Sequence, residues 1–510
     1  EKAILLTSDF RRDNLSLKLN YDPSKKIKLE FSGRYARTQV LGDGQSDATG
    51  DSKSTPSGSF GRIRHSIIQT PLTLNGTGDI VLDDNSIDSG LEDPVTALND
   101  NYKKRIRQIF NMNGAFTWNV FKNFSLRSDI GLDIYDNSLR YFYGTSTYES
   151  QNNTQASYKN MPVTQNTDVT RRTFRNTNTA TYDFKDLMPK DHNLNLMIGE
   201  ENIVIKEEKI TARVEGFPTF YDADMAFHFS AQGTPTKYDD YYFPDDKMVS
   251  FFGRLNYDYK GRYLLTSTLR ADGSSKFAEG NRWGYFPSAA VAWRITEEKW
   301  MENTKNWLNN LKLRFSYGIS GNNNIPSGQT SKTYSMTQSS WLNIANSYLT
   351  AGTTLNNKNL KWETTHSFNI GLDYGLFNNR LNGSLEVYKN NVKNLLMEMQ
   401  VAGCGYNTQY QNVGETENKG FEITLNYTAL NKKDYGLDFS FTLGHNVNKV
   451  KSLGSMESYT KASYWASTEV GSDYIIKPGL PVGSIYGYHT DGRYETSDFT
   501  GYTNGKWVLK

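Results

Sequence analysis

Hydrophobic and polar residues alternate along most of this chain, and the pattern is clearest over residues 251–295. Two alternating runs there flank a two-residue link at Lys260 and Gly261, which predicts a β-hairpin. A third alternating run follows a longer polar connection. Tyrosines cluster beside the tight link, at Tyr257, Tyr259 and Tyr263. Amphipathic rings in that place are typical of the membrane interface of an outer-membrane barrel, although the rim of a soluble sandwich is the alternative.

The alternation also persists over runs that are long for a soluble sheet. Residues 123–135 alternate over thirteen positions. Strands of soluble sheets have about 5–6 residues, whereas a tilted strand that crosses a bilayer needs about 9–11. We therefore expect one set of side chains to face lipid and the other to face a wet lumen. The apolar set is Leu126, Ile130, Leu132 and Ile134, and the polar set is Arg127, Asp129 and Asp133.

Short and long connections alternate between the predicted strands, of which we count about fourteen, plus a partial one at 484–488. The short turns lie at 22–25, 121–122, 185–191, 260–261, 378–379 and 432–433. The long connections cover roughly 41–104, 150–169, 206–247, 272–283, 320–364, 394–418 and 449–483. One short helix is expected within 296–310. This asymmetry predicts an all-β fold, a transmembrane antiparallel up-and-down β-barrel with periplasmic turns and long extracellular loops.

Composition alone would suggest a soluble protein. The chain has 510 residues, 22% of them charged, and a mean hydropathy of −0.66. Its apolar runs are far shorter than the ~20 residues of a membrane helix. Mean hydropathy and the length of apolar runs do not detect a membrane barrel, because every second strand residue faces a polar lumen. The net charge of +2 gives no indication of a nucleic-acid partner, and the single Cys404 excludes an internal disulfide framework.

Candidate chemistry is sparse, so we expect no enzyme activity, no cofactor and no metal. The six histidines lack metal-ligand spacing, and no nucleophile or phosphate-binding motif occurs. The cluster of Asp43, Asp47 and Asp51 departs from the EF-hand spacing, which favours a solvated acidic loop over a calcium site. Glu200 and Glu201 lie on alternate faces of one strand, so they cannot act together on a glycosidic bond.

Ligand contacts are instead expected from aromatic residues of the long connections and the upper lumen. Flat apolar faces with polar edges make such residues suitable stacking platforms for a ligand. The alternative is that they pack within their own loops or contact a lid protein. The candidate substrate-binding residues are Tyr241, Tyr242, Trp341, Tyr406, Tyr410, Tyr464 and Trp465.

Several motifs resemble those of the SusC/RagA family, in the same order along the chain. They include RADGSSKF (270–277), GNRWGYFPSAAVAWRITEEKWM (280–301), LRFSYGISGNNNI (313–325), LKWETT (360–365), NVGETENKGFEI (412–423) and KPGLPVGSIYGYHTDGRY (477–494). The resemblance covers roughly residues 10–500. It implies a TonB-dependent transporter of the Bacteroidota outer membrane, with a barrel of about 22 strands around an N-terminal plug.

The same resemblance implies partners and a substrate class. A SusD-like surface lipoprotein would act as a lid, TonB would supply energy, and outer-membrane lipid would surround the barrel. The resemblance also allows for a dimer of SusC–SusD pairs. The imported substrate would be an oligosaccharide or an oligopeptide. Alternatives are a siderophore- or cobalamin-type TonB-dependent receptor, or a soluble all-β carbohydrate-binding or hydrolase module.

The chain starts at Glu1 without a methionine or signal peptide, and we expect it to be part of a barrel domain whose plug and last strands are absent. The first strand descends toward the short-turn side, so an odd number of strands should precede it in an even-stranded barrel. We therefore expect an open, curved wall whose two edge strands do not meet.

Overall fold

The computed structural model describes residues 6–42, 98–153, 155–242, 244–338, 347–401, 403, 405–462, 472–490, 492–503 and 506–510. Its main element is one sheet of fifteen strands, fourteen of them on a single path, with β7 (Thr234–Tyr242) attached to β6. The path is β1 (Asp9–Ser24), β2 (Ile27–Leu41), β3 (Asn101–Phe121), β4 (Phe124–Tyr143), β5 (Val163–Asp183), β6 (His192–Glu215), β8 (Asp246–Tyr259), β9 (Tyr263–Ser274), β10 (Trp283–Arg294), β11 (Leu308–Asn322), β15 (Glu363–Leu376), β16 (Leu381–Lys393), β19 (Glu415–Asn431) and β20 (Gly436–Ser452).

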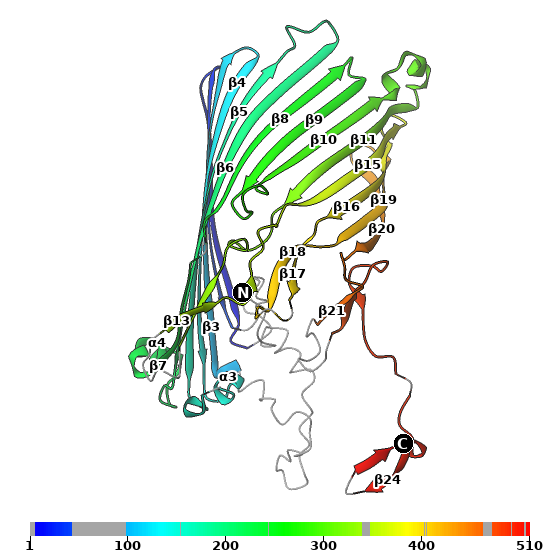
Figure 1. The fold of residues 1–510 in the computed structure, drawn as a ribbon. Coiled ribbons are helices and arrows are strands. Elements are labelled where there is room, and N and C mark those ends of the chain that lie inside the picture. Colours follow the sequence, from blue (N-terminus) through cyan, green and yellow to red (C-terminus); the bar gives the residue numbers. More distant parts are fainter. Residues whose placement is uncertain are drawn as a thin grey trace.

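Neighbouring strands of this path are all antiparallel, which confirms the expected all-β, up-and-down order. β1 and β20 form the two edges of the sheet, and within the described part of the chain no pairing joins them. Figure 1 shows the resulting curved wall, from β1 in blue to β20 in orange. The described residues thus form the expected open wall, with the expected fourteen crossing strands.

Every strand on the path is longer than one bilayer crossing requires. β6 has 24 residues and β4 has 20, while the shortest strands on the path, β9 and β10, have 12 each. A tilted spanning strand needs about 9–11 residues. The run predicted over 123–135 is therefore only part of β4, and the longest strands extend beyond the apolar belt.

The two faces of the wall differ in the way that the alternation predicts. On the outer face, Leu15, Leu17 and Leu19 of β1 are 69%, 51% and 54% exposed, and Ile130 of β4 is 51% exposed. On the inner face, Arg127 of the same strand forms ion pairs across to β2 and along β4. The expected separation of Ile130 from Arg127 is confirmed, because register and contacts place them on opposite faces.

The short turns lie at the top of Figure 1, and stacked aromatic rings lie beside the turn at Lys260. Lys260 and Gly261 have φ of +58° and +63°, and Arg262 N donates to Tyr259 O at 2.9 Å, which identifies a type I′ turn. Beyond it, the Tyr263 ring stacks between those of Tyr259 and Trp293. The tyrosine cluster predicted beside this turn therefore forms one edge of the apolar belt.

The short helix expected within 296–310 is present as two 3₁₀ segments, η3 (Ile295–Glu297) and η4 (Lys299–Thr304). The extended backbone of Glu298 interrupts any longer helix. Its carboxylate accepts hydrogen bonds from Tyr263 Oη at 2.6 Å, Arg262 Nη1 at 3.0 Å and Trp293 Nε1 at 3.1 Å. The Tyr263 hydrogen bond, opposed by burial, holds the pKa of Glu298 below its ordinary value. This buried carboxylate ties the aromatic rings to the β10–β11 connection.

The long connections carry small elements of their own, some of which lie at the bottom of Figure 1. They include α3 (Tyr148–Gln151), α4 (Ala223–His228), β12 (Tyr334–Gln338), β13 (Ser347–Ala351), β14 (Thr354–Leu355), β17 (Leu396–Gln400), β18 (Thr408–Asn412), β21 (Tyr459–Lys461), β22 (Tyr474–Ile476), β23 (Ser484–Ile485), β24 (Phe499–Thr503) and β25 (Lys506–Leu509). Among the described residues, no helix is long and apolar enough to span a membrane.

The partial crossing strand predicted at 484–488 is wrong. The structure gives only β23 there, and it pairs with β22 in a separate three-stranded sheet. Gly479 and Gly483 have φ of +96° and +83°, so the backbone turns twice just before this segment. The alternation of Ile485 with its polar neighbours therefore belongs to a loop sheet and not to the wall.

Candidate functional site

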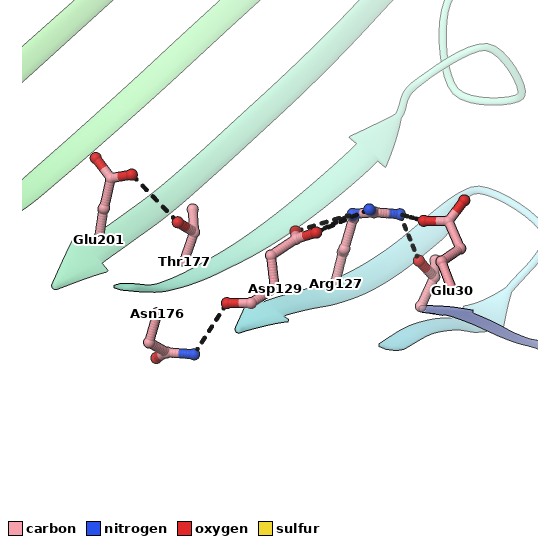
Figure 2. Close-up of polar contacts among 7 residues, drawn as sticks. Glu30, Arg127, Asp129, Asn176, Thr177 and Glu201 are labelled. Carbon is pink, nitrogen blue, oxygen red and sulfur yellow. Dashed lines mark hydrogen bonds and ion pairs between the residues drawn. The ribbon is translucent and has the colours of Figure 1, made fainter. Parts of the chain in front are cut away.

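The inner face of the wall carries arginines that are each held between two carboxylates, an arrangement that we call acid–arginine trios. In the first, Arg127 of β4 forms ion pairs with Glu30 of β2 at 2.6 Å and Asp129 at 2.8 Å, and donates to Thr117 Oγ1 at 3.2 Å. Figure 2 shows the guanidinium lying between the two acids. All four side chains share one face because inward residues alternate along each strand.

A second trio spans β6 and β9. Arg270 reaches Glu201 at 2.7 Å and Asp272 at 2.6 Å, and its Nη2 donates to Ser250 Oγ at 2.8 Å. The Thr177 hydroxyl donates to Glu201 at 3.3 Å, and this bond is also visible in Figure 2. These contacts continue the polar inner surface across four neighbouring strands, β5, β6, β8 and β9.

A third trio lies on β11, β15 and β16. Arg314 donates to both carboxylate oxygens of Asp373, at 2.9 and 2.7 Å, and to Glu386 at 2.9 Å. Asn369 completes the set by donating to Glu386 at 3.2 Å. The two-point contact with Asp373 fixes the plane of the guanidinium, which a lysine in its place could not do.

The side chains of these trios are paired with one another and are not arranged for catalysis. Every carboxylate in them is tied to an arginine, so none is held ready as a general acid or base. Within the described residues, no group of three or more His, Cys, Asp or Glu side chains could hold a metal ion. The trios instead fix donors and acceptors along a half-exposed wall, which suits contact with a polar polymer or a polar protein segment.

The long connections have a small apolar core of their own, at the end of β10 and β11 that is opposite to the short turns. Phe277, Phe286, Ile325, Leu360 and Trp362 are buried there, and Tyr410 packs against them. Trp362 Nε1 donates to Arg282 O at 2.9 Å. Because Phe286 points inward from β10, this core anchors three long connections to the inner side of the wall.

The structure places the predicted aromatic residues in different environments. Tyr410 lies on β18, partly buried against the loop core, and burial raises the pKa of its phenol. Tyr406 lies just before β18 and is partly exposed. Tyr241 and Tyr242 belong to β7, whose backbone pairs with β6 at Lys209 and Glu208.

The structure does not bring the seven predicted residues together as one site. Trp341, Tyr464 and Trp465 lie outside the described residues, as do Cys404 and the aspartates Asp43, Asp47 and Asp51. Sequence reasoning missed other exposed aromatic side chains on the β6–β8 connection, namely Phe220, Phe229 and Tyr238, with exposures of 75%, 58% and 72%. The signal was present, because long connections rich in aromatic residues are typical of binding loops.

The chain matches the family described as TonB dependent receptor-like, beta-barrel, over residues 59–508. Among curated relatives, TonB-dependent receptor P3 of Formosa agariphila is 31% identical over 312 residues, which is 60% of this chain and 30% of that protein. TonB-dependent receptor SusC of Bacteroides thetaiotaomicron is 36% identical over 253 residues, 47% of this chain and 25% of that protein. The chain thus aligns with only part of each relative.

Solved structures agree with this fold. The RagAB peptide transporter matches with a TM-score of 0.73 and 22% identity, over 93% of this chain and 50% of that chain. The RagAB peptide importer in the closed-closed state matches with a TM-score of 0.73 and 21% identity, over 99% of this chain and 53% of that chain. At these identities, the likeness establishes the shared fold of the wall.

The family match decides several expectations. It confirms an outer-membrane location, so the apolar outer face of the wall is the face that meets lipid. It also confirms that the chain is a receptor barrel and not an enzyme, which excludes the soluble hydrolase module. The chain therefore belongs to the TonB-dependent receptor-like β-barrel family, and within that family it is SusC/RagA-like.

Proposed function

We propose that this chain forms part of a TonB-dependent importer that moves an oligosaccharide or an oligopeptide across the outer membrane. The observation that carries the proposal is the wide polar inner face. The thirteen steps between the fourteen strands, at about 4.8 Å each, give a wall about 62 Å in contour. A barrel of 16–18 strands already leaves an aqueous channel, so a barrel that includes this wall has room for a polar oligomer.

A SusD-like surface lipoprotein and the TonB complex are the proposed partners. Support comes from the relatives, because the RagAB match is described as a peptide transporter and SusC as a TonB-dependent receptor. The acid–arginine trios supply donors and acceptors that suit either a peptide backbone or sugar hydroxyls. The siderophore- or cobalamin-type receptor remains the second candidate, and it would import a compact ligand.

We further propose that loop aromatic residues contact the substrate. Tyr406 fits this role best among the described residues, since it is partly exposed just before β18. Tyr241, Tyr242, Trp341, Tyr464 and Trp465 remain candidates. Tyr410 would act indirectly in this proposal, by holding β18 in place against the loop core.

Deletion of the gene in its own bacterium tests the proposal. We expect the deletion strain to lose growth on one class of oligomer as sole nutrient, either peptides or one glycan, and to keep growth on the corresponding monomers. Complementation with wild type should restore growth, and complementation with Tyr406→Ala should restore it only at higher oligomer concentration. Loss of growth only under iron or cobalamin limitation would instead favour the second candidate.

A further inference from the structure

A small polar cluster interrupts the apolar belt on the outer face of the wall. Asn178 of β5 donates to Glu200 Oε1 of β6 at 3.1 Å and to Asn176 Oδ1 at 2.7 Å. Asn176 in turn donates to the backbone carbonyl of Asp129 at 3.2 Å, from the side opposite to the Arg127 trio (Figure 2). The cluster of Asn176, Asn178 and Glu200 therefore faces lipid and not the lumen.

Register places this cluster inside the belt and not at its rim. Along β5, the outward residues on either side of the two asparagines are Phe174 and Ala180, and along β6 those around Glu200 and Asn202 are Ile198 and Val204. A carboxylate among lipid-facing apolar residues is unfavourable, and ionisable groups at membrane depth usually have a function. A bound ligand that interacts with the Glu200 carboxylate would make the position of this side chain favourable.

Asn178 and Glu200 of this cluster line the centre of a groove of about 920 Å³. The floor of the groove holds the small residues Ser128, Ala180, Gly253 and Ala271, and aromatic or aliphatic side chains stand at both ends. One register row runs along it through seven neighbouring strands. The row is Phe116, Ser128, Asn178, Glu200, Phe251, Ala271 and Tyr285.

The dimensions of the groove indicate an extended chain. Six steps between neighbouring strands, at about 4.8 Å each, give a length of about 29 Å. The groove is open along its length, and its floor of small residues leaves a shallow channel between the outward aromatic and aliphatic side chains. An extended hydrocarbon chain can lie along such a channel.

The groove also specifies where the occupant carries a polar group. Glu200 accepts one hydrogen bond from Asn178, and among the described residues it has no ion pair. A carboxylate can accept about four hydrogen bonds, so Glu200 needs N–H or O–H donors from outside the chain. Phe116 and Trp118 at one end, with Phe251 and Tyr285 at the other, require hydrocarbon on both sides of those donors.

We propose that this groove binds a membrane lipid whose amide N–H or hydroxyl lies between two hydrocarbon segments, with Glu200 as the acceptor. Ester-linked lipids have no donor at that position and would leave Glu200 unsatisfied in hydrocarbon. The ligand class is thus an amide-linked, hydroxylated acyl lipid that lies across β3 to β10.

Photo-crosslinking to the receptor reconstituted in phosphatidylcholine vesicles tests this proposal. The probe is a ceramide with a diazirine on its N-acyl chain and an alkyne handle. We expect wild-type protein to be labelled within residues 178–204 and 246–274, and unlabelled ceramide to compete. Glu200→Leu, which removes the acceptor, should reduce labelling at least tenfold. Glu200→Gln keeps an amide oxygen as acceptor and should retain most of it.

A groove-filling variant makes the test independent of charge. A Cβ at Gly253 would have only ordinary contacts, the nearest at 3.7 Å, so Gly253→Leu should fold and fill the groove. It too should reduce labelling tenfold. The control, Val387→Leu, adds a methylene on the outer face of β16, remote from the groove, and should label like wild type.

Folding of each variant is checked by the mobility of unheated samples in SDS gels, where a folded barrel differs from the unfolded chain. Equal labelling of wild type, Glu200→Leu and Gly253→Leu would overturn the proposal. So would competition by excess short-chain phosphatidylcholine as effective as that by ceramide. A photoreactive residue in place of Leu269 that crosslinks in cells to a protein instead of a lipid would also overturn it.

Discussion

Replacing Ile130 with arginine tests whether the outer face of the wall meets hydrocarbon. Ile130 is 51% exposed on β4, and its register neighbours Gly114 and Asn176 have no side chain that could neutralise a cation. Arginine near the bilayer midplane of a barrel costs about 2–4 kcal/mol, and less toward the interfaces. At 1.4 kcal/mol per factor of ten, the folding equilibrium of Ile130→Arg should shift by roughly 30- to 700-fold.

The assay is reversible urea unfolding of the receptor in lipid vesicles, followed by tryptophan fluorescence. We expect the midpoint to fall while the urea dependence stays unchanged, because the surface exposed on unfolding is nearly the same. Ile485→Arg is the matched control, since Ile485 is 86% exposed on the loop sheet and should shift stability by less than about 0.5 kcal/mol. Equal costs for the two substitutions would refute the assignment of the outer face.

Three further predictions concern the inner face, the short-turn end and the orientation of the wall. Arg270→Met should lower the free energy of unfolding by about 1–3 kcal/mol, because it leaves Glu201 and Asp272 without their cation. The control is Arg11→Met, which removes an exposed ion pair and should cost under about 1 kcal/mol in the same urea assay. Glu298 has a lowered pKa, so its stabilisation should be full above the ordinary glutamate pKa of about 4.3 and disappear as pH falls through its native pKa. The stability difference between wild type and Glu298→Gln should therefore shrink toward acid pH, and a constant difference would contradict the hydrogen-bond network. In a Cys404→Ser background, a cysteine at Lys332 should react with a membrane-impermeant maleimide on intact cells and one at Lys260 should not, and the reverse would invert the topology.

The wall was predictable from the sequence because the order and facing of its strands depend on residues that are close together in the chain. Period-2 alternation and tight turns fix strand order and facing without any knowledge of distant contacts. This is why the hairpin around Lys260 and the facing of Ile130 against Arg127 agree with the structure. Errors arose where alternation was short, as over residues 484–488, where a partial membrane strand was predicted and the structure has only the two-residue loop strand β23.

The candidate site was less predictable because its contacts join distant segments. The trio of Arg314 brings together residues 59 and 72 positions away, and no local pattern indicates them. Tyr410 looked like a free platform in sequence, yet it packs against a core built from residues 277–362. An aromatic residue in a loop has the same local signature whether it meets a ligand or its own loop.

Glu200 and Glu201 show what the register of the sheet adds to alternation. The sequence separates the two acids onto opposite faces, but only the pairing of β6 identifies their neighbours. Glu201 meets Arg270 and Thr177 on the wet inner face, where an acid needs nothing further. Among the described residues, Glu200 accepts one side-chain hydrogen bond, from Asn178, in a belt of apolar side chains. The same residue type is therefore ordinary on one face, whereas on the other it indicates an interaction that the isolated wall does not supply.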